Sequence, residues 1–187
     1  IDPGQEQDVA DAHPEVVAQL SAELERVNQR NAEPDHRYVI GSDRHNPVEF
    51  TPDHWHDRTG LGWWQSGIIE GGGAPASTLV EVDRDGAYEF RLRRWPEAVD
   101  QPISSAAEVR VPSNAYGGTK MVPGTALPVV KAKLKVAGFD KTIEVTDNMV
   151  EAMFTVPLKK GKHDIYSEFL DKGGNGFGVH YLYVKRR

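Results

Sequence analysis

Residues 78–95 read Thr78-Leu-Val-Glu-Val-Asp-Arg-Asp-Gly-Ala-Tyr-Glu-Phe-Arg-Leu-Arg-Arg-Trp95. Polar and apolar side chains alternate on both sides of Arg84-Asp85-Gly86, and a period of two is typical of a strand with one buried face. The Asp-Gly pair between the two runs indicates a hairpin turn. Tyr88, Phe90 and Leu92 then share one face, which we expect to be buried.

Further short alternating runs follow, with turn residues such as Gly138 and Lys159-Lys160-Gly161-Lys162 between them. Strands at this spacing are typical of two antiparallel sheets packed face to face. The sequence therefore predicts a mainly β fold, an antiparallel β-sandwich or jelly roll. The runs are residues 129–137, 139–146, 151–158, 163–170 and 177–185.

Residues 14–30 have a helical period instead. Their apolar side chains recur at steps of three and four, and Pro14 suits a first helical turn. We expect one amphipathic N-terminal helix ahead of the sandwich. The chain is thus divided into residues 1–35, a tail helix with a linker, and residues 36–187, the sandwich domain. The apolar positions of the helix are Val16, Val17, Leu20, Leu24 and Val27.

Charge and composition narrow the possible partners. The 187-residue chain has no cysteine and a net charge of -6. Nine acidic and two basic side chains fall in residues 1–35, which leaves residues 36–187 close to neutral. A body this close to neutral, without a large basic stripe, predicts no nucleic-acid partner. Lys131, Lys133 and Lys135 share one strand face, and we interpret that face as solvated.

Hydropathy argues against a membrane span, because no run of about eighteen apolar residues occurs and the mean hydropathy is -0.54. The beginning of the sequence also lacks a signal-peptide pattern.

The densest polar motif is Asp53-His54-Trp55-His56-Asp57. On an extended chain His54 and His56 point to the same side, so a metal ion bound by His54, His56 and Asp57 is one interpretation. Histidines hydrogen-bonded to the backbone are the alternative.

All four tryptophans fall between residues 55 and 95. Trp55, Trp63, Trp64 and Trp95 can stack on sugar rings in a glycan site. The alternative is that the four indoles seal the sandwich or a contact between domains.

Arginine next to tryptophan indicates a second kind of site. Arg93 and Arg94, with Arg91, are suited to bind an anion such as a sulfate ester. A solvent-facing strand side with local ion pairs is the alternative. No nucleophile motif of the Gly-x-Ser-x-Gly, His-Glu-x-x-His or P-loop type occurs, so we predict no catalytic residue in this chain.

Three segments resemble the C-terminal region of bacterial arylsulfatases. The opening, Ile1-Asp2-Pro3-Gly4-Gln5-Glu6-Gln7-Asp8-Val9-Ala10-Asp11-Ala12-His13-Pro14-Glu15-Val16-Val17, is similar to the end of a sulfatase catalytic domain, and residues 79–97 and 177–184 are similar to segments that follow it. Sulfatases carry a Cys/Ser-x-Pro-x-Arg motif that is matured to formylglycine. The present sequence has no such motif.

The resemblance implies that the chain is a piece of a sulfatase: a non-catalytic C-terminal accessory domain that packs on a missing catalytic domain and helps to select the substrate. Calcium or magnesium is then expected only in that missing domain, no cofactor in this chain, and a periplasmic or secreted location. The alternative is an independent carbohydrate-binding module that recognises a sulfated or unsulfated glycan. A stand-alone enzyme is a third class, which predicts ester hydrolysis by this chain.

Overall fold

The computed structural model describes residue 4 and residues 6–31, 36–56, 65–106, 109–112, 119–122 and 124–187. The chain divides into two compact units, Ile1–His36 and Arg37–Arg187. We describe each unit by itself.

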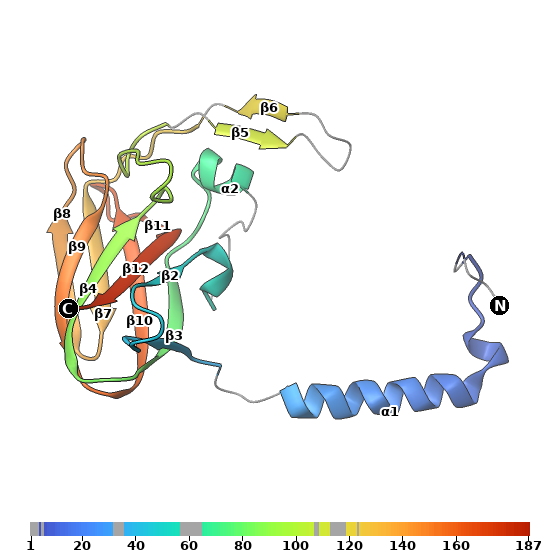
Figure 1. The fold of residues 1–187 in the computed structure, drawn as a ribbon. Coiled ribbons are helices and arrows are strands. Elements are labelled where there is room, and N and C mark those ends of the chain that lie inside the picture. The colour runs from blue at the N-terminus through green and yellow to red at the C-terminus, as the bar shows by residue number, and fades with distance from the viewer. Residues whose placement is uncertain are drawn as a thin grey trace. The chain divides into compact units, whose positions relative to one another are not determined.

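The first unit contains a short 3-10 helix, η1 (Ala10–Ala12), and the helix α1 (Pro14–Asn31). The amphipathic helix expected from the sequence is therefore present (Figure 1). Its apolar stripe is exposed, and Leu20 and Leu24 are 65% and 61% accessible. On another side of the helix, Arg26 pairs with Glu23 at 2.6 Å.

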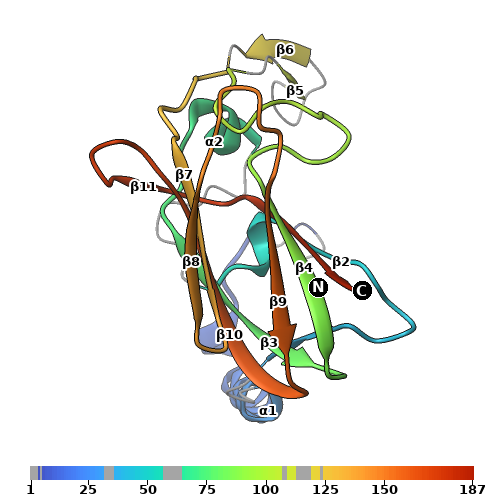
Figure 2. The same ribbon diagram turned by 90° about the vertical axis from the view of Figure 1, so that its left-hand side faces the viewer.

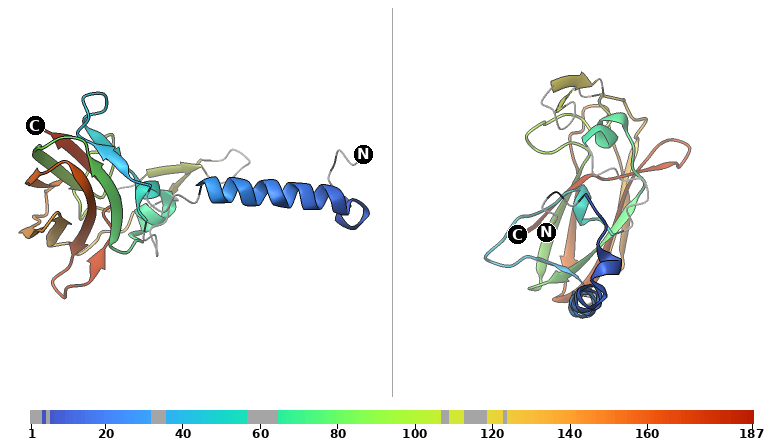
Figure 3. Two further views of the ribbon diagram at one scale, coloured as in Figure 1. Left: turned by 90° about the horizontal axis from the view of Figure 1, so that it is seen from below. Right: turned by 90° about the vertical axis from the view of Figure 1, so that its right-hand side faces the viewer.

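The second unit is a sandwich of two β-sheets, which confirms the predicted fold class. One sheet has the order β1-β3-β10-β7-β8, with β11 beside β10, and the other has the order β2-β12-β4-β9. Figure 2 shows β7 and β8 on one side of the unit and β9 and β4 on the other, and Figure 3 gives two further views. The strands and short helices are β1 (Tyr38–Ile40), β2 (Val48–Phe50), η2 (Pro52–His54), α2 (Gln65–Glu70), β3 (Ala76–Val82), β4 (Gly86–Arg93), β5 (Val109–Pro112), β6 (Thr119–Val122), β7 (Lys131–Val136), β8 (Phe139–Glu144), β9 (Ala152–Leu158), β10 (Gly161–Leu170), β11 (Gly176–Phe177) and β12 (Tyr181–Arg186).

The expected hairpin at Arg84-Asp85-Gly86 is wrong, because β3 and β4 lie in different sheets. The turn is a corner at which the chain passes from one sheet to the other, and the connection from β9 to β10 is a second corner of this kind. β3 pairs with β10, and β4 pairs with β9. The two bent strands therefore form one antiparallel ribbon folded over the core, as in a jelly roll. Asp85 joins the corners, since its carboxylate accepts from Lys160 N at 2.7 Å and pairs with Lys159 Nζ at 2.7 Å.

The core lies between the sheets and takes the apolar face of each strand. Tyr88, Phe90 and Leu92 are fully buried, as the alternation predicted. The opposing sheet contributes residues of β7 and β10, among them Leu134 and Phe169. Among the described residues, no helix has both the length and the apolar character needed to cross a bilayer.

The lysine face of β7 agrees with the solvated interpretation. Each lysine lies close to a carboxylate: Lys131 to Glu144 at 3.8 Å, Lys133 to Asp140 at 3.8 Å and to Glu168 at 3.9 Å, and Lys135 to Asp140 at 3.5 Å.

Gly41 marks a close approach of the backbone to Tyr88. Its φ is +77°, a conformation that favours glycine. A Cβ at this position would lie 2.0 Å from the Tyr88 hydroxyl, which is held by its hydrogen bond to Arg84 O at 2.7 Å.

We therefore expect Gly41→Ala to lower the free energy of unfolding by about 3 kcal/mol, from backbone strain together with overpacking. Gly138→Ala is the matched control, because Gly138 has a φ of +80° with no atom within 4 Å of the added Cβ. It should cost only about 1 kcal/mol. Urea unfolding of both variants measures the difference, and equal losses would contradict the proposed clash.

Candidate functional site

Two of the four tryptophans that were predicted to stack on sugar rings are buried. Trp55 and Trp95 are 1% and 2% accessible, so neither indole offers a free face to a sugar ring. Trp55 belongs to the main core, and Trp95 packs with Ile68 and Ile69 of α2. For these two residues the structure fits the interpretation that they seal the fold. Trp63 and Trp64 lie outside the described residues.

The predicted metal ligands are only partly described. His54 Nδ1 lies 3.0 Å from Thr51 N and accepts its hydrogen, which gives His54 a capping role at η2. The ring of His54 also packs against Tyr38, with the centroids 4.9 Å apart. His56 is exposed, and Asp57 lies outside the described residues. Across the described part of the chain, no group of three or more His, Cys, Asp or Glu is arranged to hold a metal ion.

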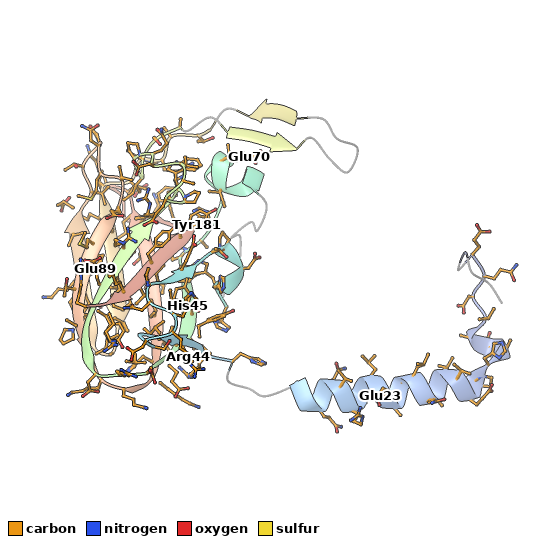
Figure 4. All side chains as sticks on the ribbon, in the orientation of Figure 1. Glu23, Arg44, His45, Glu70, Glu89 and Tyr181 are labelled. Atoms are coloured by element: carbon orange, nitrogen blue, oxygen red, sulfur yellow. The ribbon has the colours of Figure 1, made fainter. Side chains whose placement is uncertain are left out.

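Arg93 is already neutralised by neighbouring acids. It is 4% accessible and binds Glu151 at 3.1 Å and Asp100 at 3.2 Å. On the same outer face Arg91 lies 2.5 Å from Glu97, and Glu89, labelled in Figure 4, lies nearby at 4.0 Å. These guanidinium groups hold the segment after β4 on the sheet and are not free for a sulfate ester. The solvent-facing alternative is also wrong for Arg93, because Trp95 O and Asp100 cover it.

Arg94 is fully buried and binds backbone oxygens instead of an anion. Its guanidinium donates to Ser105 O and Thr125 O, each at 2.8 Å, and to Ile68 O and Ile69 O, each at 3.2 Å. It also lies 4.4 Å from the centre of the Trp95 ring. Burial lowers the pKa of Arg94 to about 10, so the group remains a cation at neutral pH. Both interpretations made from the sequence, an anion site and an exposed strand side, are therefore wrong for Arg94.

The carbonyls that Arg94 binds belong to three segments at one end of the sandwich. Ile68 and Ile69 are in α2, Ser105 follows β4, and Thr125 precedes β7. Further backbone hydrogen bonds join these segments to each other. Leu127 N donates to Ser104 O at 3.1 Å, and Thr125 N donates to Ile69 O at 2.9 Å. Arg94 thus fixes the loops of this end around one buried charge.

An open hollow of about 400 Å³ lies among the same loops. We call its aliphatic lining, residues 127–130 (Leu-Pro-Val-Val), the floor, and its polar side chains the rim. The lining comes from the segments after β4, before β7, between β8 and β9, and between β10 and β11, at the upper end of the sandwich in Figure 1. The polar rim consists of Ser104, Asp147, Asp171 and Lys172.

The rim groups differ in their partners. Asp171 accepts hydrogen bonds from Asn175 N at 2.8 Å and Asn175 Nδ2 at 2.7 Å, and these bonds hold the pKa of Asp171 below its usual range. Asp147 and Lys172 are exposed, and within the described residues their side chains form no hydrogen bond or ion pair. A carboxylate and an ammonium group are therefore available to a ligand on the floor of the hollow.

A second hollow, of about 450 Å³, lies at the turn between β7 and β8. Its polar groups already bind one another: Lys135 pairs with Asp140 at 3.5 Å and lies over the Tyr166 ring at 5.6 Å. Asp164 is paired with Arg37 at 3.1 Å. The first hollow is therefore the better candidate site.

The rim of the first hollow was not predicted from the sequence. The segment from Lys172 to Asn175 forms the turn before β11, and Lys172 and the preceding Asp171 also line the hollow. The charges of these loops gave no usable signal, because the sequence does not show which loops meet at one end of the sheets.

His180 is a second buried group behind this end. It is 1% accessible, and its Nε2 lies 3.0 Å from Gly72 O. Because a carbonyl oxygen only accepts, Nε2 carries the hydrogen, and Nδ1 is buried without a hydrogen-bond partner among the described residues. Burial lowers the pKa of His180 to about 4.

We expect Arg94→Lys to lower the free energy of unfolding by about 3 kcal/mol, because an ammonium group cannot reach carbonyls in three segments at once and buried acceptors lose their donors. Arg84→Lys is the control, since Arg84 is half-exposed and pairs with Asp43 at the surface. Its effect should stay within about 0.5 kcal/mol. Urea unfolding measures both, and a mild Arg94→Lys variant would show that the four hydrogen bonds contribute little.

His180 should make stability depend on pH. The pKa in the folded state, about 4, lies below that of an unfolded chain, so protons bind to the unfolded state first. His180 therefore makes its full contribution to the free energy of unfolding above about pH 6.5. Below that pH the unfolded state gains protons, and the free energy of unfolding falls by about 2 kcal/mol between pH 7 and pH 5. His180→Gln should remove this part of the pH dependence in urea unfolding, and His45→Gln, at an exposed position, should keep it. If the free energy of unfolding depends on pH in the same way in wild type and in His180→Gln, His180 is not the group responsible.

No protein-family model and no curated protein matches the sequence. Solved structures with a similar strand arrangement include a ruminal GH26 endo-β-1,4-mannanase (16% identity, TM-score 0.37, 75% of this chain and 26% of that chain) and a GH26-CBM35 β-(1,4)-mannanase from Podospora anserina (10%, 0.39, 76% and 28%). A family 35 carbohydrate binding module from Clostridium thermocellum is similar at 14% identity, with a TM-score of 0.38, over 76% of this chain and 100% of that chain. The chain thus spans about a quarter of the length of the two mannanases. All these TM-scores are below 0.5, and a likeness at this level does not show what the chain does.

Proposed function

We propose that the unit Arg37–Arg187 is a non-catalytic glycan-binding module and that the hollow at its loop end holds the sugar. One observation carries this proposal: an open hollow with an aliphatic floor has a carboxylate and an ammonium group on its rim that no described residue uses.

The lining suits the chemistry of a sugar ring. One face of a pyranose is made of C–H groups, which can pack on Pro128 and its aliphatic neighbours. Hydroxyl groups at the edge of the ring both donate and accept, so they can donate to Asp147 and accept from Lys172. Hydrogen bonds to charged groups contribute more than those between neutral groups. A hollow of this size accommodates one or two sugar units.

The loops of the hollow are held before a ligand arrives. Val130 N donates to Leu170 O, and Val145 N donates to Val130 O, each at 2.8 Å. Ile103 N donates to Met149 O at 2.9 Å. A ligand that binds a preformed surface does not have to order it, which favours affinity.

The state of Asp171 favours binding over hydrolysis. A glycosidase needs one carboxylic acid whose pKa is raised, so that it can protonate the leaving group. The pKa of Asp171 is lowered by its hydrogen bonds to Asn175, from which each of its two oxygens accepts one hydrogen bond. Asp171 is therefore suited to remain an anion.

The test is calorimetric titration of the full chain with a panel of neutral and sulfated manno- and galacto-oligosaccharides. We expect at least one to bind, and Asp147→Ala and Lys172→Ala each to weaken that binding about tenfold through loss of a charged hydrogen-bond partner. Asp53→Ala is the control, because Asp53 is an exposed acid outside the hollow.

Chromatography of the titrated sugars should show no shortening. Absence of binding across the panel, or release of shorter sugars, would reject a non-catalytic glycan-binding module.

The accessory role in a sulfatase is a second candidate function, and the exposed apolar stripe of α1 favours it. Val16, Val17, Leu20 and Leu24 are 42–65% accessible, as expected of a helix whose partner surface lies elsewhere. A periplasmic or secreted location goes with this proposal. A Cys/Ser-x-Pro-x-Arg motif upstream in the same reading frame is the observation that would establish it.

A further inference from the structure

We propose that the hollow selects uncharged glycans and rejects sulfated ones, with Asp147 and Asp171 as the residues that determine this specificity. The inference rests on the proposed glycan-binding function and names the chemical class of its ligand.

The rim of the hollow carries a net negative charge. Two carboxylates and one ammonium group line the hollow, which gives it a net negative charge. Lys172 is a single flexible cation next to Asp171 in the sequence. Sulfate esters are bound best by the planar fork of guanidinium, and no arginine is among the described residues that line this hollow.

Hydrogen bonds hold one of the two carboxylates, that of Asp171, in its ionised form. Asn175 donates to both oxygens of Asp171, through its backbone N at 2.8 Å and its side-chain Nδ2 at 2.7 Å. These bonds favour the ionised form, so Asp171 does not become neutral when an anion approaches near neutral pH. Asp147 lacks such bonds and is the exposed charge of the loop between β8 and β9.

Two described cations near the hollow, Arg94 and Lys131, are already engaged. Arg94 lies behind the loops with no accessible surface, and its donors point to four carbonyls. Lys131, next to the floor residue Val130, lies 3.8 Å from Glu144. Neither is positioned to offset the carboxylates for an anionic ligand, whereas hydroxyl groups of a neutral sugar can donate to both acids.

The experiment compares a neutral galacto-oligosaccharide with a sulfated one of the same length, titrated into the full chain. We expect the neutral sugar to bind about tenfold more tightly at low salt, and the ratio to shrink at about 0.5 M salt because screening weakens the repulsion. Asp147→Asn should reduce the ratio about threefold by strengthening binding of the sulfated sugar. Asp53→Asn, the matched change outside the hollow, should leave the ratio as in wild type.

The outcomes separate the two proposals. Equal or tighter binding of the sulfated sugar by wild type would overturn the selectivity and leave glycan binding intact. An unchanged ratio in Asp147→Asn would overturn the role of Asp147. Binding of neither sugar class would remove the proposed function, and the selectivity with it.

Discussion

A single buried cation organises the loop end of this domain. The Arg94 guanidinium binds backbone oxygens of α2, of the segment after β4 and of the segment before β7, and it does so without a carboxylate partner. A buried charge is unfavourable unless nearby dipoles compensate it, and here the carbonyl groups do so. The same contacts satisfy the carbonyls that end α2. The position of each loop around the candidate hollow therefore depends on the others through one side chain.

The strands could be predicted from the sequence, but not their partners. Alternation in residues 78–95 correctly assigned the buried face of Tyr88, Phe90 and Leu92. It could not distinguish a hairpin from a corner, because both place two amphipathic strands on either side of a short polar turn. The difference is tertiary: in a corner the apolar faces meet across the core, while in a hairpin they lie side by side. Ala137-Gly138 does join a true hairpin, β7 with β8.

The site could not be predicted from the sequence for a related reason. Arginine next to tryptophan is compatible with a surface anion site and with a buried contact, and only the packing around Arg94 decides between them. The rim residues Ser104, Asp147 and Lys172 come from loops far apart in the sequence. The proximity of Asp147 and Lys172 follows from the sheet order, in which β8 and β10 lie on either side of β7, whereas Ser104 follows β4 of the other sheet. No local motif records that order.

The contacts of Asp85 with Lys159 and Lys160 bear on how the domain folds. Its two hydrogen bonds join positions 74 and 75 residues apart, and the loop that they close contains the strands from β4 to β9. Such contacts form only after a long loop has closed, with an entropy cost that grows slowly with length. Assembly is thereby governed by distant encounters more than by local turns, which is typical of slow-folding β proteins. Until the ribbon closes, strands such as β3 and β4 expose both an apolar face and unpaired backbone, and the newly made chain is then most prone to aggregate.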